Sequence, residues 1–571
     1  MADLLIKGGL VVDGTGTPGS ENDVGVHDGR IVPPDELTAR PEVIDASGLV
    51  VAPGFIDLHT HYDAQLSWDP AATPSPFHGV TTAVGGNCGF ALAPAGPEHA
   101  PYLMRMMARV EGMPLDALEA GLAWDWTTHA EWMAGLDGNI AVNAGFLVGH
   151  SAVRRAVMHD ACHEVATEEQ INEMVRVVAD ACSAGALGFS TSTAPTHNDG
   201  DGQPVPSRAA TPDELVALSA AVGESPGTTL ECILAGCING FTRDDVDLLA
   251  RMSVAGNRPV NWNVLGVSTL DPGRHIGQLA AADVVAERGG RLVALTLPHS
   301  MRVRLSFLSG FILDGLPGWR PIMALPVDER MRALRDPGTR RRMKAGAASD
   351  EAGMLRAVAD WSRLLIIETL SPENARFEGR TVGDVAREQG SDDPFDVLLD
   401  LVLADSLRTG LGLGPMRENE AEWRLRASVW NDPRTVIGGS DAGAHLDMMC
   451  GAIYSTALLA HGVREFEVIS LEAAVHQLTD VPARLYGLTG RGRVADGYAA
   501  DLVIFDPERV GYETERTRAD LPGGASRLYA ESSGVHHVLV NGVPIVEDGV
   551  LTGATPGTLL RSGLDTETVT P

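Results

Sequence analysis

The chain has 571 residues, of which 44% are apolar, and its 44 basic and 76 acidic residues give a net charge of −32. The apolar share rules out global disorder, and the acidic balance argues against a nucleic acid or an anionic membrane surface as partner. The sequence has no run of about 18 apolar residues, so no transmembrane helix is predicted. No signal peptide is evident, and six cysteines in a chain of this length do not indicate a disulfide scaffold. These features predict a soluble globular protein of the cytoplasm.

Both ends of the chain contain short strand-like segments bounded by Gly-rich turns. In chain order these are residues 4–14, 23–32, 493–506 and 536–549. The second segment has Asp28-Gly29 at its centre, a dipeptide that is typical of a hairpin turn. We expect residues 1–53 and 488–571 to pair in one small β-sandwich.

Between these ends, over residues 54–487, apolar strand candidates alternate with amphipathic helix candidates. The strand candidates are residues 55–58, 81–85, 140–148, 188–190, 229–234, 260–265, 291–297 and 435–438, and the helix candidates include 167–184 and 211–222. Eight strands with helices between them predict an α/β fold, a parallel (β/α)8 barrel of the TIM type. The stretch from about 302 to 431 is too long for one crossover. We expect it to be an insertion over the barrel mouth, with a helical Arg-rich segment at 329–344.

The first predicted barrel strand leads directly into a His-x-His pattern, in PGFIDLHTH. Positions i and i+2 of a strand point to the same side, so His59 and His61 can both reach one metal ion. Barrel active sites lie at the carboxyl ends of the strands, which is where this pair would be placed.

Two further metal-binding candidates follow other predicted strands. Cys88 lies among glycines after the second strand and could offer a thiolate to a metal. Its alternative role is that of a small buried apolar residue. Asp441 follows the last strand, where a carboxylate could bind the metal and take a proton from water. Its alternative role is to cap the next helix.

Several motifs together resemble a known family. They are PGFIDLHTHYD, VTTAVGGNCGFALAP, LVGHSAVRRAVM, ALGFSTS, SDAG and GRVADGYAADLVIFD, which are spread over nearly the whole chain. They are similar to the amidohydrolase superfamily, and more narrowly to its N-acyl-D-amino-acid deacylase (D-aminoacylase) branch. The resemblance implies a (β/α)8 barrel with a β-sandwich built from both chain ends, in agreement with the expectation above.

The resemblance also implies hydrolysis of an amide-type bond by metal-activated water. His59 and His61 match the first-strand ligands of the family, Cys88 matches the bridging cysteine of the branch, and Asp441 matches the last-strand aspartate.

The resemblance is incomplete at the metal ligands. Relatives carry one metal-binding histidine on each of the fifth and sixth strands, where this chain has Glu231 and Asn263. Glu231 could supply an oxygen ligand or be a structural partner of an arginine, and Asn263 could supply a weak ligand or contact substrate. His299, after the seventh strand, could polarise a carbonyl or be a wall residue. The two lysines, Lys7 and Lys344, lie outside the predicted barrel strands, which excludes the subclass that bridges two metals with a carboxylated lysine.

The substrate site is less defined than the metal site. His150 and Arg154 match a segment that lies near the active site in relatives, and we expect them to bind substrate. Relatives that bind a free α-carboxylate have an arginine shortly after the last-strand aspartate, whereas this chain does not. A guanidinium is the usual carboxylate partner, and Arg302 or Arg304 could replace it.

These observations predict a metal-dependent hydrolase of a small-molecule amide, with Asp441 as general base and then acid. One Zn²⁺ on His59, His61 and Cys88 is favoured, and a second ion on Cys88 and Glu231 is the alternative, because a neutral one-ion site acidifies water less. Two other functions stay open, namely hydrolysis of a lactam, lactone or carbamate, and a catalytically silent binding protein. A homo-oligomer is compatible with the sequence.

Overall fold

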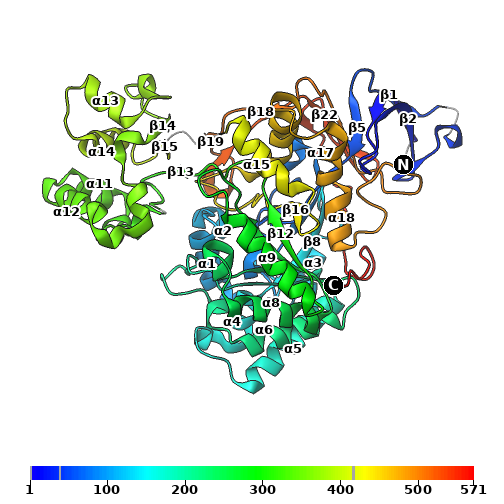
Figure 1. Cartoon of the computed structure of the whole chain (residues 1–571), viewed down its shortest axis with the longest axis horizontal. Coiled ribbons are helices and arrows are strands. Elements are labelled where there is room, and N and C mark those ends of the chain that lie inside the picture. Colours follow the sequence, from blue (N-terminus) through cyan, green and yellow to red (C-terminus); the bar gives the residue numbers. More distant parts are fainter. Residues whose placement is uncertain (1–2, 38–39, 311, 414–417) are drawn as a thin grey trace.

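The computed structural model describes residues 3–37, 40–310, 312–413 and 418–571. At its centre lies an eight-stranded parallel sheet in the order β16-β12-β11-β10-β9-β8-β7-β6 (Figure 1). The strands are β6 (Phe55–Asp57), β7 (Val80–Gly85), β8 (Asn143–Gly149), β9 (Gly188–Ser192), β10 (Thr229–Ile233), β11 (Val260–Leu265), β12 (Leu292–Thr296) and β16 (Thr435–Ile437). Each of them overlaps one of the eight predicted strands.

Backbone hydrogen bonds just beyond the two edge strands close this sheet into a barrel. The His61 N–H donates to the Ala442 carbonyl at 2.8 Å, and the Asp441 N–H donates to the His59 carbonyl at 3.0 Å. The α/β barrel expected from the sequence is thereby confirmed. The closure also brings the residues after β6 beside those after β16, although they are nearly 400 positions apart in the sequence.

Helices cover the outside of the barrel. They are α1 (Ala100–Val110), α2 (Leu115–Gly121), α3 (His129–Leu136), α4 (His150–Met158), α5 (Glu168–Ser183), α6 (Pro212–Gly223), α7 (Ala235–Asn239), α8 (Arg243–Gly256), α9 (Arg274–Glu287), α15 (Glu420–Trp430), α16 (Tyr454–Ala457), α17 (Leu471–Leu478) and α18 (Asp480–Tyr486). Helix α5 shows the local cause: Thr167 and Gln170 form a capping box at its start, and Met174, Val178, Ala181 and Cys182 form its buried stripe.

Strands from both chain ends pair in one nine-stranded sheet. Its members are β1 (Leu4–Val11), β2 (Ser20–His27), β3 (Arg30–Val32), β4 (Glu42–Asp45), β5 (Val50–Pro53), β17 (Leu502–Phe505), β22 (Val535–Val540), β23 (Val543–Glu547) and β24 (Val550–Leu551). The antiparallel pair β5–β17 joins the two ends. Side chains alternate along β17, so that Val503 and Phe505 belong to the barrel's core while Leu502 and Ile504 belong to a separate core of the terminal sheet.

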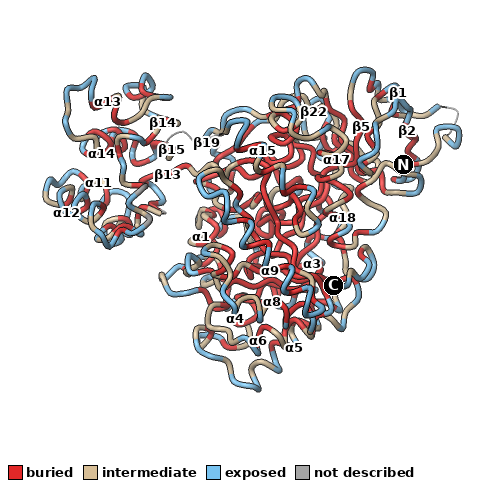
Figure 2. The backbone as a smooth tube through the Cα atoms, in the orientation of Figure 1, coloured by how far each residue is buried: buried red, intermediate tan, exposed pale blue. Residues whose placement is uncertain are grey.

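A separate lobe lies between β12 and α15, on the left in Figure 1. It contains the sheet β13 (Arg304–Leu305), β15 (Gly410–Gly412) and β14 (Leu365–Glu368), and the helices α10 (Arg320–Met323), α11 (Val327–Arg335), α12 (Pro337–Ala348), α13 (Val382–Glu388) and α14 (Pro394–Ala404). The lobe has its own buried core (Figure 2). Helix α15, by contrast, packs Trp423 and Trp430 into the barrel core, so the predicted insertion divides into a lobe and a barrel helix. Its Arg-rich segment is two helices, because Pro337 begins a new helix capped by Asp336.

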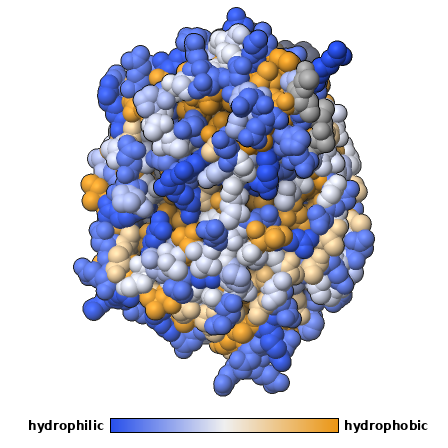
Figure 3. Space-filling model, turned by 90° about the vertical axis from the view of Figure 1, so that its right-hand side faces the viewer, coloured by the Kyte–Doolittle hydropathy of each residue, from blue (hydrophilic) through white to orange (hydrophobic). Residues whose placement is uncertain are grey.

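Two short antiparallel pairs complete the chain between β17 and β22. They are β18 (Gly511–Tyr512) with β21 (Ser532–Ser533), and β19 (Arg516–Arg518) with β20 (Arg527–Tyr529). Among the helices of the described ranges, none combines the length and the apolar character that crossing a membrane requires. On the face shown in Figure 3, apolar side chains lie in several separate groups surrounded by hydrophilic ones.

Candidate active site

The predicted first-strand ligands lie in the segment that follows β6, inside the barrel mouth. His59 is 2% exposed and His61 is fully buried. Asp57, the last residue of β6, accepts a hydrogen bond from the His59 N–H at 3.4 Å and one from the Ser440 hydroxyl at 2.5 Å. Asp57 therefore fixes the histidine segment and the segment after β16 against each other.

Cys88 lies in a tight turn directly after β7. Its backbone is left-handed (φ +55°), and the flanking Gly86 and Gly89 are left-handed as well, which only glycine adopts without strain. The Ser190 hydroxyl on β9 accepts a hydrogen bond from the Gly89 N–H at 2.9 Å. The Cys88 N–H donates to Oε2 of Glu231 on β10 at 2.8 Å. The turn is thus held from two neighbouring strands, and it presents the thiol to His59.

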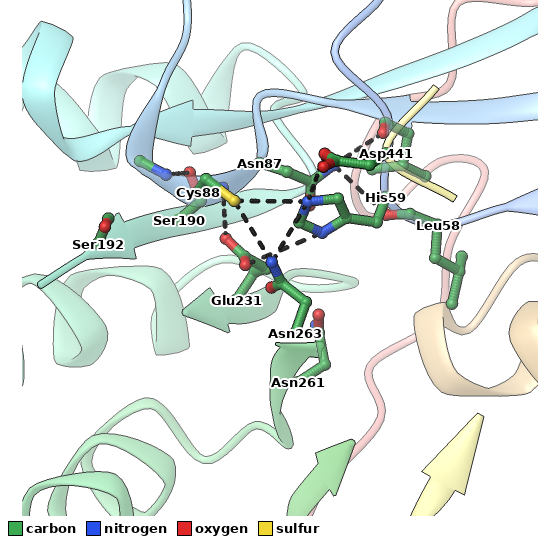
Figure 4. Close-up of polar contacts among 12 residues, drawn as sticks. Leu58, His59, Asn87, Cys88, Ser190, Ser192, Glu231, Asn261, Asn263 and Asp441 are labelled. Atoms are coloured by element: carbon green, nitrogen blue, oxygen red, sulfur yellow. Dashed lines mark hydrogen bonds and ion pairs between the residues drawn. The ribbon is translucent and has the colours of Figure 1, made fainter. Parts of the chain in front are cut away.

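Side-chain atoms from three strand ends lie close together in the mouth. Those of His59, His61 and Cys88 lie within 4.8 Å of one another, and Asp441 lies beside the two histidines. The Cys88 Sγ lies 3.4 Å from the His59 Nε2. The Asp441 Oδ1 lies 3.6 Å from the His59 Nε2 and 3.1 Å from the His61 Nε2. Figure 4 shows the Cys88 thiol and the Asp441 carboxylate each in contact with the His59 ring. One sulfur, two imidazole nitrogens and one carboxylate are a donor set that suits zinc. The buried His61 imidazole thus directs its Nε2 to the Asp441 carboxylate, at the place where an ion would bind both.

The electrostatics of this cluster favour a cation. Burial lowers the pKa of His59 to about 3, so its imidazole is neutral and able to act as a ligand. Burial would lower the pKa of His61 too, but the carboxylates of Glu111 and Asp441 outweigh it and raise that pKa to about 10. Burial and the nearby carboxylates raise the pKa of the Cys88 thiol well above its usual range. A thiol in such surroundings ionises only when a metal binds it.

Glu231 and Asn263 also face this cluster, from β10 and β11. The Asn263 Nδ2 lies 3.4 Å from both the His59 Nε2 and the Cys88 Sγ. Figure 4 marks both contacts with dashed lines. The Glu231 Oε1 lies 4.0 Å from the His59 Nδ1, on the side of the ring that faces away from Asp441. Burial raises the pKa of the Glu231 carboxyl to about 8. The two positions therefore lie at the site, although neither offers an imidazole.

Two residues at the site were missed by the sequence analysis. Glu111 directly follows α1 and places its Oε1 3.6 Å from the His61 Nδ1. His445 places its Nε2 3.5 Å from the Asp441 Oδ2. Glu111 could have been found, because it continues the apolar stripe of α1, which runs through Leu103, Met106, Met107 and Val110. A carboxylate in an apolar stripe is seldom buried without a partner.

His150 and Arg154 share one partner, Glu214, on the outer side of the strands. Both side chains are fully buried, and the Glu214 Oε1 lies 2.9 Å from the His150 Nε2 and 2.5 Å from the Arg154 Nη1. The Arg154 Nε also donates to the carbonyl of Cys162 at 3.1 Å. This geometry favours a structural role for both residues over the predicted contact with substrate.

His299 and Arg304 lie on the seventh-strand side of the mouth. The His299 Nδ1 lies 2.8 Å from the Ser300 carbonyl oxygen, and burial lowers the pKa of this histidine. Its Nε2 is buried with no hydrogen-bond partner among the described residues, so it could still face a substrate. Arg304 instead pairs with Glu368 in the lobe at 2.7 Å.

A cavity of about 340 Å³ opens beside the site. Its lining includes His445, which contacts Asp441. It also includes Gly112, which follows Glu111 in the chain. Arg105 and Arg109 of α1 line the same cavity. They pair with Asp201 at 3.6 Å and with Asp314 at 2.5 Å. The wall of the cavity that includes His445 therefore also carries two guanidinium groups.

Comparison with known proteins decides the family. The sequence matches the Amidohydrolase family over residues 42–546. The chain belongs to the amidohydrolase family. This amidohydrolase is 30% identical to a D-aminoacylase of Alcaligenes xylosoxydans xylosoxydans, over 98% of this chain and 97% of the relative. It is also 30% identical to an N-acyl-D-aspartate deacylase of the same organism, over 98% of this chain and 95% of the relative. The resemblance to the D-aminoacylase branch is confirmed.

Solved structures agree with this assignment. A crystal structure of D-aminoacylase, described as defining a novel subset of amidohydrolases, matches 98% of this chain and 100% of that chain, with a TM-score of 0.64 and 26% identity. A second D-aminoacylase structure, described by its binuclear metal centre with one-metal activation and second-metal attenuation, matches equal shares with a TM-score of 0.63 and 27% identity. The prediction of a metal-dependent amidohydrolase is in keeping with both.

Proposed function

We propose that this amidohydrolase cleaves the amide bond of a small N-acyl-D-amino acid. The observation that carries the proposal is the cluster of His59, His61 and Cys88 in the barrel mouth, with Asp441 Oδ1 beside the Nε2 atoms of both histidines. The named activities of the D-aminoacylase and the N-acyl-D-aspartate deacylase support the substrate class. The bond cleaved is then a carbon–nitrogen bond other than a peptide bond.

These four residues would hold one divalent ion, with zinc favoured by the sulfur and nitrogen donors. When bound, such an ion supplies Lewis acid chemistry that polarises a carbonyl and acidifies water. Glu231 and Asn263 offer oxygens near Cys88, but they lack the imidazoles that would make a strong second site. We therefore favour a single tightly bound ion.

Asp441 moves the proton in this proposal. Burial alone would raise the pKa of its carboxyl, but the hydrogen bond from His61 and the charges of His445 and His61 outweigh burial and hold the pKa below its usual value. The carboxylate is therefore ionised at neutral pH and can take a proton from the attacking water. The same carboxyl group can return that proton to the leaving nitrogen as the C–N bond breaks.

The cavity beside the site would hold the amino-acid part of the substrate. An arginine after the last-strand aspartate, expected for a free α-carboxylate, is absent from this chain. Arg105 and Arg109 are the guanidinium groups on the cavity wall, and a planar guanidinium pairs well with a carboxylate. We propose that they replace the missing arginine.

The test is hydrolysis of paired N-acetyl-D- and N-acetyl-L-amino acids by the zinc-loaded protein, followed through release of the free amine. We expect turnover of the D-enantiomers, and a fall in kcat of about 10²- to 10⁴-fold in Asp441→Asn with loss of general acid–base catalysis. Asp405→Asn is the matched control, because Asp405 is 2% exposed but lies in the lobe core.

Three other outcomes would each overturn the proposal. Turnover of a lactam, lactone or carbamate without turnover of any N-acyl amino acid would assign another bond. Zinc binding without turnover of any of these would point to a silent binding protein. Equal rates for Asp441→Asn and the wild type would remove Asp441 from the proton transfer.

A further inference from the structure

Each of the two site imidazoles presents its second nitrogen to a buried carboxylate. The His61 Nδ1 lies 3.6 Å from the Glu111 Oε1, and the His59 Nδ1 lies 4.0 Å from the Glu231 Oε1. The Glu111 side chain is 3% exposed and that of Glu231 is fully buried. Both separations are ion-pair contacts that are longer than hydrogen bonds. In the described part of the chain, neither Nδ1 atom has a hydrogen-bond partner to compete with its carboxylate.

The Nε2 atoms of the same two rings face the opposite way, toward Asp441 Oδ1. An imidazole that binds a metal through Nε2 carries its proton on Nδ1, and a carboxylate that accepts this N–H fixes the tautomer and the ring orientation. Hydrogen bonds of this kind are often long in unliganded sites and shorten when the site is filled. The arrangement of each ring is therefore that of an imidazole held from behind by a carboxylate.

Glu231 acts on a second member of the site as well. Its Oε2 accepts the Cys88 N–H at 2.8 Å, while its Oε1 faces His59. The Glu231 carboxylate thus contacts both the backbone turn that carries the Cys88 thiol and the imidazole ring of His59. Each oxygen of Glu231 therefore faces a residue that carries a metal-binding atom. The carboxylate is placed to support these two residues from behind.

We propose that Glu111 and Glu231 are positioning residues that hold His61 and His59 through Nδ1, and that Glu231 also holds the Cys88 turn. The inference rests on the proposed function only in its assumption that the site binds a metal. It gives Glu231 a supporting role, where the sequence had left open an oxygen ligand or a structural partner of an arginine, and it gives Glu111 a role that was not predicted from the sequence.

The test is zinc affinity, measured by competition with a chromophoric chelator on the full chain. We expect Glu111→Gln and Glu231→Gln each to weaken zinc binding by about 10- to 100-fold, the usual effect of losing such a partner. The stoichiometry should stay at one ion per chain. Glu111→Asp keeps the carboxylate and should recover part of the affinity. The thermal midpoint of the metal-free protein is recorded for every variant, because a purely structural role would change it without changing the affinity of the folded protein for zinc.

Glu214→Gln is the matched control. Glu214 is also fully buried and faces a histidine, His150, but that histidine is outside the metal site. This variant should lower the thermal midpoint and leave the zinc dissociation constant unchanged. Unchanged zinc affinity in Glu111→Gln and Glu231→Gln would overturn the inference. A fall from two ions to one in either variant would make that glutamate a ligand and would also overturn it. If Glu231→Gln does not fold, the two Glu111 variants decide.

Failure of the inference is distinct from failure of the proposed function. If the wild type binds zinc but hydrolyses no N-acyl amino acid, the proposed function fails while the affinities of the variants still test the two glutamates. If the wild type binds no zinc, the metal site itself fails, and both proposals are overturned together.

Discussion

Cys88 shows how strongly the site depends on single residues. Its thiol is buried beside carboxylates that raise its pKa well above the usual range, so it ionises only with a cation bound. A serine hydroxyl at this position does not become a comparable anionic ligand. We expect Cys88→Ser to weaken zinc binding by more than the roughly 10- to 100-fold that loss of a supporting partner costs. Zinc per chain after dialysis is the measurement, with Cys182→Ser, which changes a buried cysteine of α5, as control. A Cys88→Ser variant that retains its zinc would place the ion on the histidines and Asp441 alone.

Single residues also show where sequence reasoning was sufficient and where it was not. The spacing of His59 and His61 predicted a shared direction because strand geometry is local. Asp441 could be placed at the same mouth because it follows the last predicted strand, and barrel closure puts that strand beside the first. Glu111 was not foreseen, since its contact with His61 depends on how α1 ends over the mouth. The substrate role of His150 came from resemblance alone, and its packing against Glu214 is a tertiary contact that no local pattern reveals.

At the scale of elements, the eight barrel strands were predictable because buried parallel strands appear in a sequence as short apolar runs bounded by glycine. The boundary between the lobe and the barrel was harder to predict from the sequence. Helix α15 is amphipathic like its neighbours, and nothing in its sequence says whether Trp423 enters the lobe core or the barrel core. Only the structure places it in the barrel core.

The lobe sheet is joined to the C-terminal strand β19 by one buried carboxylate. Glu368 on β14 pairs with Arg304 of β13 at 2.7 Å and accepts the N–H of Thr517 on β19 at 3.1 Å. We expect Glu368→Gln to cost about 3–5 kcal/mol of unfolding free energy, because it leaves the buried Arg304 charge unpaired. Glu378→Gln, which breaks the more exposed pair with Arg516 at 3.2 Å, should cost about 0–1 kcal/mol. Urea unfolding gives both costs, and hydrogen exchange of β13–β15 and β19 shows whether the loss is local. Equal costs for the two variants would contradict the anchoring role.

For the whole molecule, two electrostatic effects act in opposite directions as the pH falls. The net charge of −32 produces repulsion among the acidic groups, and protonation of carboxylates relieves it. Buried neutral histidines oppose this gain, because the unfolded chain takes up protons that the folded chain excludes. His78 is a clear case. It is fully buried, with its Nδ1 2.8 Å from the Thr456 hydroxyl and its Nε2 3.2 Å from the Ala530 carbonyl. The carbonyl can only accept, so the Nε2 carries the proton of a neutral ring.

Burial lowers the pKa of His78 from 6.5 to about 4, so its contribution to stability is lost as the pH falls from about 6.5 toward 4. Between pH 7 and pH 5 the loss from this one group is about 2 kcal/mol. We expect the unfolding free energy of His78→Gln, measured in urea, to fall by about that much less than the wild type over this interval. Tyr62→Phe removes a nearby buried hydrogen bond to Ser75 without removing a group that titrates in this range. It should therefore lower stability equally at both pH values. If His78→Gln loses as much stability as the wild type, His78 does not stay neutral in the folded protein, and relief of acidic repulsion together with the other buried groups governs the response to acid.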